Sequence, residues 1–181
     1  MNLSELLMKH RIVVLGGELD MEKAVSIVMQ LLYLDAENKE ERIDLYIYSP
    51  GGSVNAGLAI IDTMHRIRPP VSTICIGEAY SMAAWILAAG EKGMRYALPH
   101  SQIMIHQTVA RYGGRTEDIK IFTEKLLKDE EEMVRLLSLY TGQPEERIKE
   151  DIRNDYFLSA KEAKDYGLID EILEGRNSTA R

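Results

Sequence analysis

The chain has 181 residues, of which 45% are hydrophobic and 28% are charged, as is typical of one globular domain with a sizeable core. A net charge of −7 and the lack of a Lys/Arg cluster argue against binding to nucleic acid. No apolar run approaches a membrane span and the N-terminus carries no signal-peptide core, so we expect a cytoplasmic protein without a membrane partner.

The first ninety residues are predicted to repeat one unit, a strand followed by a helix, three times. After a short helix over 3–9, the predicted strands cover 11–16, 43–48 and 71–76, and the predicted helices cover 21–34, 53–67 and 81–90. In the helix over 21–34, the residues spaced for one buried face are Ala24, Ile27, Val28, Leu31 and Leu32. Three such units indicate an α/β fold with parallel strands and right-handed crossovers.

The second half of the chain has a different pattern. Short strands are predicted over 96–99 and 102–106, and 168–173 is predicted to be a strand or a turn. Between them, one highly charged helix is predicted over 116–140, with an apolar stripe formed by Ile119, Phe122, Leu126, Met133 and Leu137. Such a helix is either a solvated arm or lies against another subunit. Residues 175–181 are polar and are expected to be frayed.

Ser81 stands where the third predicted unit passes from its strand and a turn at Gly77 into an apolar helix. One interpretation is that Ser81 caps this helix, which is the commonest role of serine at such a junction. The other is that it is a nucleophile whose oxyanion would be stabilised by backbone N–H groups and the helix dipole. The local sequence alone leaves both interpretations open.

A nucleophilic serine needs a base and a third group that orients the base. Of the four histidines, only His106 ends an apolar strand, where it is either a base or a half-buried structural histidine. Asp155 is a candidate for the third group, or else a surface carboxylate. The glycines after Ser49-Pro50 form either a plain turn or a backbone that closely approaches a ligand. Because no His, Cys, Asp or Glu group has the spacing of a zinc site, we predict no metal and no cofactor. The single cysteine, Cys75, is predicted to be buried and unreactive.

Four segments taken together resemble the proteolytic subunit of the Clp proteases. They are Tyr46-Ile-Tyr-Ser-Pro-Gly-Gly52, Gly77-Glu-Ala-Tyr-Ser-Met-Ala-Ala84, Met104-Ile-His-Gln107, and Asp155-Tyr-Phe-Leu-Ser-Ala160 with Tyr166-Gly-Leu-Ile-Asp170. Each segment alone is a weak signal, but all four occur in the family's order and cover nearly the whole chain.

The resemblance implies a serine endopeptidase with Ser81 as nucleophile, His106 as general base and acid, and a buried Asp155 that orients the imidazole. It implies that the backbone N–H groups of Gly52 and Met82 form the oxyanion hole. The implied substrates are unfolded polypeptides delivered by an ATP-dependent AAA+ Clp unfoldase, while peptide hydrolysis itself needs no ATP.

The resemblance also implies a single domain over residues 1–181. Its fold would be a spiral of strand–helix units related to the crotonases, with a protruding handle over about 107–141. The implied assembly is two stacked seven-membered rings, a homo-oligomer or a hetero-oligomer with a paralogue. The implied unfoldase-docking pocket contains Tyr46, Tyr96 and Leu173.

Some positions depart from the family pattern. Asp44 stands where the docking pocket commonly has an aromatic residue, and little chain precedes residue 10, so we expect weak unfoldase coupling. Tyr80 places a bulky ring beside the nucleophile, where a small residue is usual. Thr108 and Asn154 also differ, the latter where an arginine often pairs across the ring interface. These departures leave a weakly active paralogous ring subunit as an alternative. A crotonase-like acyl-CoA enzyme is a third hypothesis, which the serine–histidine pairing disfavours.

Overall fold

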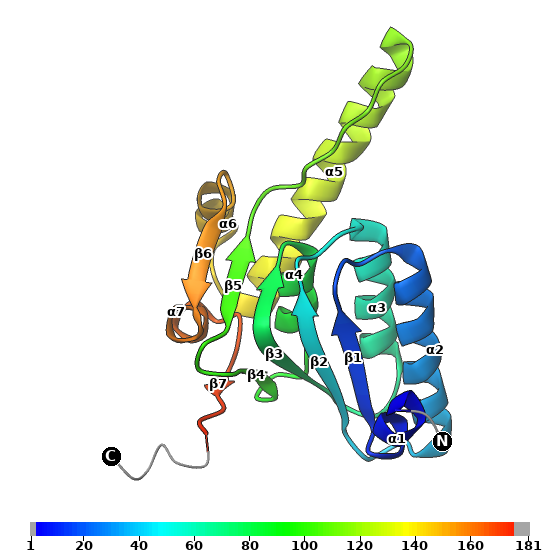
Figure 1. Cartoon of the computed structure of the whole chain (residues 1–181). Helices are drawn as coiled ribbons and strands as arrows, with labels where there is room; N and C mark the ends of the chain where they lie inside the picture. Colours follow the sequence, from blue (N-terminus) through cyan, green and yellow to red (C-terminus); the bar gives the residue numbers. More distant parts are fainter. Residues whose placement is uncertain (1–2, 176–181) are drawn as a thin grey trace.

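The computed structural model describes residues 3–175 (Figure 1). The expected fraying of residues 175–181 therefore concerns, apart from Gly175, residues outside this range. Within this range the helices are α1 (Leu3–Lys9), α2 (Met21–Glu37), α3 (Val54–Arg66), α4 (Met82–Ala88), α5 (Thr116–Thr141), α6 (Glu145–Asp151) and α7 (Ala160–Tyr166). The strands are β1 (Ile12–Gly16), β2 (Ile43–Ser49), β3 (Val71–Tyr80), β4 (Arg95–Ala97), β5 (Gln102–Ile105), β6 (Tyr156–Ser159) and β7 (Glu171–Ile172).

All these strands belong to one mixed sheet. Its main path runs β1-β2-β3-β4-β7, and every pair along it is parallel. The last three residues of β3, Glu78 to Tyr80, lie beyond the part that pairs with β4 and form a parallel pair with β5. Strand β5 in turn pairs antiparallel with β6. The expected parallel arrangement of the first three strands is therefore confirmed. The strand β6 was not predicted, because its four residues are too short for a clear alternating pattern.

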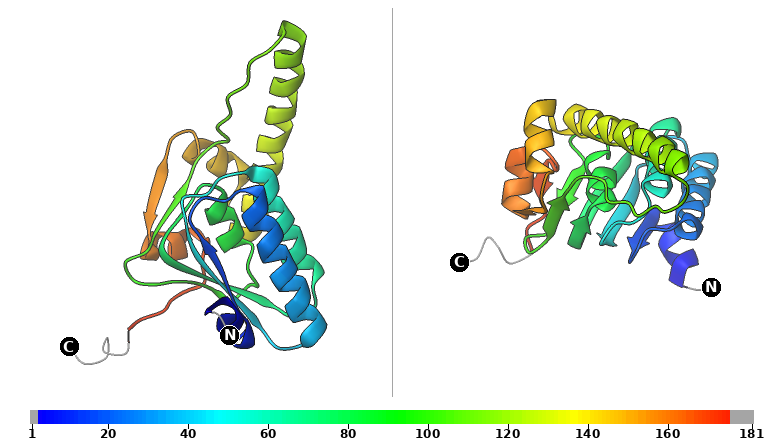
Figure 2. Two further views of the ribbon diagram at one scale, coloured as in Figure 1. Left: turned by 45° about the vertical axis from the view of Figure 1, so that its right-hand side comes forward. Right: turned by 90° about the horizontal axis from the view of Figure 1, so that it is seen from above.

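Helices α2 and α3 pack side by side on one face of the sheet (Figures 1 and 2). On α2 the residues that reach the core are Ala24, Ile27, Leu31 and Leu34. The prediction that Leu32 shares this face is wrong, since Leu32 is 50% exposed. At 100° per residue, Leu32 turns away from the direction of Leu31, and Leu34 takes the core position instead.

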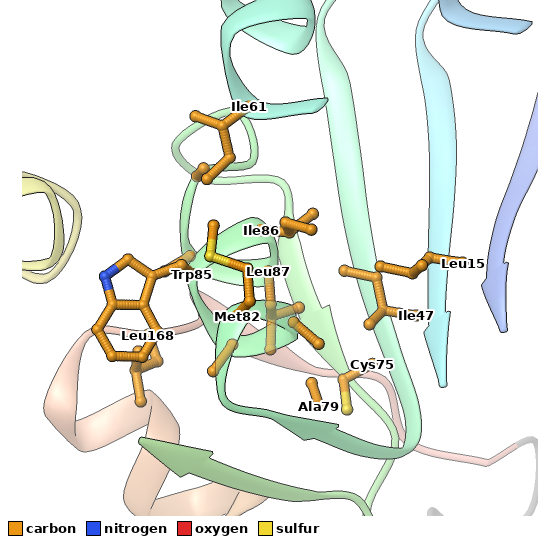
Figure 3. Close-up of a cluster of buried hydrophobic side chains, with 14 of the residues drawn as sticks. Leu15, Ile47, Ile61, Cys75, Ala79, Met82, Trp85, Ile86, Leu87 and Leu168 are labelled. Carbon is orange, nitrogen blue, oxygen red and sulfur yellow. The ribbon is translucent and has the colours of Figure 1, made fainter. Parts of the chain in front are cut away.

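Helix α4 lies at the centre of the core, and all seven of its residues are buried (Figure 3). Its small and apolar side chains allow it to pack on every side, which an amphipathic helix could not do. The first residue of this fully buried helix directly follows Ser81, so the surrounding core fixes the position of the serine.

Strand β3 is longer than predicted and continues through Gly77, which the sequence analysis took for the end of the strand. Gly77 has φ +76°, and the pairing with β2 shifts register between Ile47 and Ser49. Across this shift Tyr48 alone spans Ile76, Gly77 and Glu78, so β3 accommodates two extra residues and bends instead of ending. The ring of Tyr48 fills the space beside Gly77, where an added Cβ would lie 2.9 Å from the ring. As a result, Tyr80 ends the strand and Ser81 follows it directly.

Helix α5 projects far from the rest of the molecule (Figures 1 and 2). Its buried residues are Met133, Val134 and Leu137, all near its C-terminal end, whereas Ile119 is 42% exposed. The predicted apolar stripe is thus buried only where the helix joins the body. The helix ends at Gly142, which has the left-handed φ of +74° common at helix C-termini. None of the helices described for the chain combines the length and the apolarity needed to cross a membrane.

Candidate active site

Ser81 occupies a backbone conformation that is rare for residues with a side chain, with φ 53° and ψ −131°. Its N–H donates to the Met104 carbonyl and its carbonyl accepts from the Ala84 N–H, both at 2.8 Å. Although Ser81 is the residue before α4, its side chain makes no capping hydrogen bond. Strained backbone of this kind costs about 1–3 kcal/mol and is concentrated at functional sites.

The Ser81 hydroxyl instead contacts His106. Its Oγ lies 2.8 Å from Nε2 of the imidazole. The contact follows from the sheet, because β3 and β5 are parallel neighbours with Tyr80 opposite Met104. Ser81 and His106 come immediately after these two strands, and the carboxyl ends of parallel strands meet at one edge of a sheet.

Asp155 faces the other nitrogen of the same imidazole. It precedes β6, which pairs antiparallel with β5 so that Tyr156 lies opposite Ile105. The Asp155 Oδ1 is 3.4 Å from Nδ1 of His106, longer than an ordinary N–H···O hydrogen bond. The expectation of a buried Asp155 is wrong, since its side chain is 60% exposed. The reason is its place at the start of β6, an edge strand that pairs only with β5.

The turn after β2 brings Gly51 against Ser81. Gly51 has φ +90°, and a Cβ on it would lie 2.5 Å from the Tyr80 carbonyl and 2.8 Å from the Ser81 Cβ. Gly51 belongs to the glycine pair for which the sequence left a plain turn and a close approach both open, and its left-handed φ and this close contact both require glycine. Only the adjacent Gly-Gly pair signalled it, and that pair also fits a plain turn.

Gly52 forms a parallel bridge with Leu19. In this bridge the Leu19 N–H donates to the Gly51 carbonyl at 2.8 Å, and the Leu19 carbonyl accepts from the Ser53 N–H at 2.9 Å. Because the residues on either side of Gly52 make the ladder bonds, its own N–H points away from Leu19. Met82 is the first residue of α4, so its N–H has no acceptor within the helix.

These groups surround a pocket of about 190 Å³. Its polar lining comes from Gly52, Ser81 and His106 together with the side chains of Gln107, Thr108 and Glu130, and apolar side chains make up the remaining wall. The apolar part consists of Val54, Met82, Trp85, Val109, Met133 and Ile152. The indole N–H of Trp85 donates to the Met133 carbonyl at 2.9 Å, which joins α4 to α5. The pocket can therefore hold an apolar group beside the Ser81 hydroxyl.

The remaining predicted positions lie away from this pocket. Tyr46 and Tyr96 flank Ile74 in one row across β2, β3 and β4. Leu173 follows β7 and its N–H donates to the Ala97 carbonyl at 2.9 Å, which places it beside β4 on the side away from β3. Cys75 is buried, as predicted, and burial raises the pKa of its thiol to about 12, so it is protonated and unreactive at neutral pH.

A serine hydroxyl that contacts an imidazole, with a carboxylate on the far side of the ring, is the arrangement of the serine hydrolases as a class. Across the described residues no group of three or more His, Cys, Asp or Glu side chains could hold a metal ion. The family model for Clp protease matches residues 1–176, nearly the whole chain, and the chain therefore belongs to the Clp protease family. Membership implies a serine-type peptidase that works in an oligomeric ring with Clp ATPases.

Proposed function

We propose that this chain is the serine endopeptidase core of a self-compartmentalised Clp protease. It would hydrolyse peptide bonds of unfolded polypeptides that an ATP-dependent AAA+ unfoldase delivers. The observation that carries this proposal is the 2.8 Å contact between Ser81 Oγ and His106 Nε2 at the pocket. The hydrolysis itself would need only water and the groups of the site, and no nucleotide.

In the proposed mechanism, the Asp155 carboxylate accepts from the Nδ1–H of His106, which leaves Nε2 free to accept the hydroxyl proton of Ser81. The Ser81 oxygen then attacks the peptide carbonyl, and the imidazolium gives its proton to the leaving amine. Water enters, gives a proton to the same imidazole and attacks the acyl-enzyme ester, and the imidazolium returns the proton to Ser81 Oγ as the bond between that oxygen and the acyl group breaks. Each of the two steps restores His106 to its neutral form.

The N–H groups of Gly52 and Met82 are the proposed oxyanion hole. Support comes from the bridge with Leu19, which turns the Gly52 N–H away from Leu19, and from the place of Met82 at the start of α4. The loss of one such donor typically slows a reaction by about 10²–10³-fold. The apolar wall formed with Trp85 and Met133 suits a substrate with an apolar side chain next to the cleaved bond.

At the level of the assembly, we propose that residues 1–181 form a single domain of the spiral fold and that residues 107–141 are its handle. Two stacked heptameric rings, built from this chain alone or with a paralogue, would enclose the active sites in a cytoplasmic particle. Tyr46, Tyr96 and Leu173 would receive the unfoldase. Tyr46 and Tyr96 lie in one row across β2, β3 and β4, and Leu173 lies beside β4, which supports this role. Asp44, in the same strand as Tyr46, would weaken it.

One observation favours a second candidate, a weakly active ring subunit that needs an active paralogue. Asp155 is exposed and stands 3.4 Å from the imidazole, so the orienting group is loosely held in the single chain. In such a subunit the pocket would serve mainly to bind polypeptide, and the partner would supply most of the cleavage.

A fluorophosphonate probe, which reacts with activated serine hydroxyls, distinguishes the two candidates. We expect the assembled wild-type protein to be labelled and to cleave short peptides without ATP, and Ser81→Ala to abolish both. Ser26→Ala, which changes an exposed serine of α2, is the matched control and should leave labelling intact. An assembled wild-type particle that is neither labelled nor able to cleave peptides contradicts the peptidase proposal and supports the ring-subunit candidate.

A further inference from the structure

The three strands that carry Ser81, His106 and Asp155 share a row of side chains on the face opposite the core. The pairing places Tyr80 of β3 opposite Met104 of β5, and Met104 opposite Phe157 of β6. Each residue of this row is one or two positions along the chain from one of the site residues. The strands lie side by side in the order β3, β5, β6 (Figure 1). The row therefore crosses all three strands that position the site residues.

Tyr80 contacts both of the other strands. Its ring meets the ring of Phe157 edge to face, with the centroids 5.7 Å apart and the planes at 88°. Its hydroxyl donates to Oε1 of Gln102 at 2.8 Å. Burial and the nearby Glu78 carboxylate raise the pKa of Tyr80, so the hydroxyl keeps its proton at neutral pH. One side chain on β3 is thus joined to β5 by a hydrogen bond and to β6 by a ring contact.

Tyr80 lies on the face of the sheet away from the core and outside the pocket. Ala79 is fully buried in the core, and successive strand residues point to opposite faces, so Tyr80 points away from the core. Tyr80 is also absent from the lining of the pocket, and therefore would not touch substrate there. Any effect that it has on the site must pass through the position of the strands.

The site needs such support at two points. Ser81 is held in a strained conformation directly after Tyr80. Asp155 precedes β6, whose only sheet partner is β5, so the distance between Asp155 and His106 depends on how firmly β6 stays in place. The contact of Tyr80 with Phe157 reaches over β5 and connects the first strand of the site directly to the third.

We propose that Tyr80 is a positioning residue, whose ring and hydroxyl hold Ser81, His106 and Asp155 in register through Phe157 and Gln102. This inference rests on the proposed peptidase function and adds to it a residue outside the pocket. Small displacements of reacting groups are costly in enzymes, since a misplacement of about 1 Å can lower a rate by about 10²-fold.

The test compares three variants of the assembled protein by steady-state peptide hydrolysis and by the rate of fluorophosphonate labelling. Tyr80→Ala should lower kcat and the labelling rate by about 10-fold, with KM within about twofold, because the pocket is unchanged. Tyr80→Phe keeps the ring contact and loses only the hydrogen bond, so it should restore most of the rate. Tyr33→Ala removes an exposed tyrosine from α2, which contributes no residue to the strands of the site, and should behave as wild type.

A Tyr80→Ala protein with wild-type kcat overturns the inference, and so does an equal loss in Tyr33→Ala. If Tyr80→Ala does not assemble, Phe157→Leu replaces it, because it keeps an apolar side chain on β6 and removes the partner ring. An unchanged kcat in Phe157→Leu then overturns the inference. A wild-type protein that the probe does not label overturns the proposed function, and the positioning role with it.

Discussion

At the scale of single residues, the backbone geometry around Ser81 is set by a neighbour with no side chain. Gly51 packs directly against Tyr80 and Ser81, and its own φ of +90° lies in the left-handed region. Two requirements therefore meet at one position, the unusual dihedral angle and the lack of space. They can be separated experimentally, because Gly93 has nearly the same φ, +87°, with nothing within 4 Å of an added Cβ.

We predict that Gly51→Ala lowers peptidase activity by about 10²-fold, because the methyl group must displace Ser81 or the Tyr80 carbonyl. Gly93→Ala should keep wild-type activity. Both variants carry the same left-handed strain, about 1–2 kcal/mol, and should lose similar stability from that source. Activity assays and thermal unfolding of the two variants check this. Equal activity in both would show that the close contact at Gly51 has no catalytic consequence.

At the scale of the elements, one ion pair connects β4 to the C-terminal ends of two helices. The Arg95 guanidinium, in β4, binds the Asp170 carboxylate with distances down to 2.6 Å and also donates to the carbonyls of Ala88 and Tyr140. These two carbonyls lie in the last turns of α4 and α5. The Asp170 carboxylate in turn accepts from the Gly93 N–H. The pair is mostly buried, so the removal of one partner would leave the other without its counter-charge.

Asp170→Asn is predicted to lower the free energy of unfolding by about 3 kcal/mol at neutral pH. Burial alone would raise the pKa of Asp170, but the hydrogen bonds and the charge of Arg95 outweigh it and hold the pKa below its ordinary value of 3.8. The unfolded chain therefore takes up the proton first as the pH falls. The stabilisation is complete above the ordinary pKa and is lost as the pH falls through the lowered pKa of the folded state.

Unfolding experiments over a pH series check this prediction. The difference between wild type and Asp170→Asn should be largest at neutral pH and should shrink below pH 3.8. Asp118→Asn is the control, since Asp118 pairs with Arg115 on an exposed surface and its removal should change stability little. A difference that stays constant down to the most acidic conditions would contradict the assigned role of the charge.

The sequence predicted most elements at this scale because their patterns are local. Asp20 caps α2 by accepting from the Lys23 N–H, and Gly142 ends α5 in a left-handed conformation. The continuation of β3 past Gly77 could not be predicted, since it depends on Tyr48 from another strand. The exposure of Asp155 likewise depends on β6 being an edge strand. The resemblance had singled out the site residues, which the structure brings together, but their spacing and burial come from strand pairing.

At the scale of the whole molecule, α2 presents an apolar stripe to solvent. Its residues recur at positions that share one side of a helix and are at least half exposed, namely Met21, Val25, Met29 and Leu32. Exposed apolar groups in such a continuous pattern mark interaction sites. Since the family works as an oligomeric ring, we expect this stripe to be covered by a second copy of the chain.

We predict that Met29→Glu weakens assembly, because it places a charge in the middle of the stripe, where burial against a second copy would strip it of water. Native mass spectrometry and sedimentation velocity at a fixed protein concentration measure the effect. Ser26→Glu adds the same charge to an exposed position on the flank of α2 and should assemble normally. Met29→Glu particles that form as readily as those of Ser26→Glu would exclude the stripe from the subunit contact.

Trp85, whose indole N–H joins α4 to the C-terminal part of α5, is the only tryptophan of the chain. Trp85 stands in the wall of the pocket, three residues beyond the first residue of α4, and is nearly inaccessible to water. The tryptophan fluorescence of the protein therefore comes from one place that senses both occupancy of the pocket and any tilt of the projecting helix. The molecule carries its own optical probe, with no label to attach.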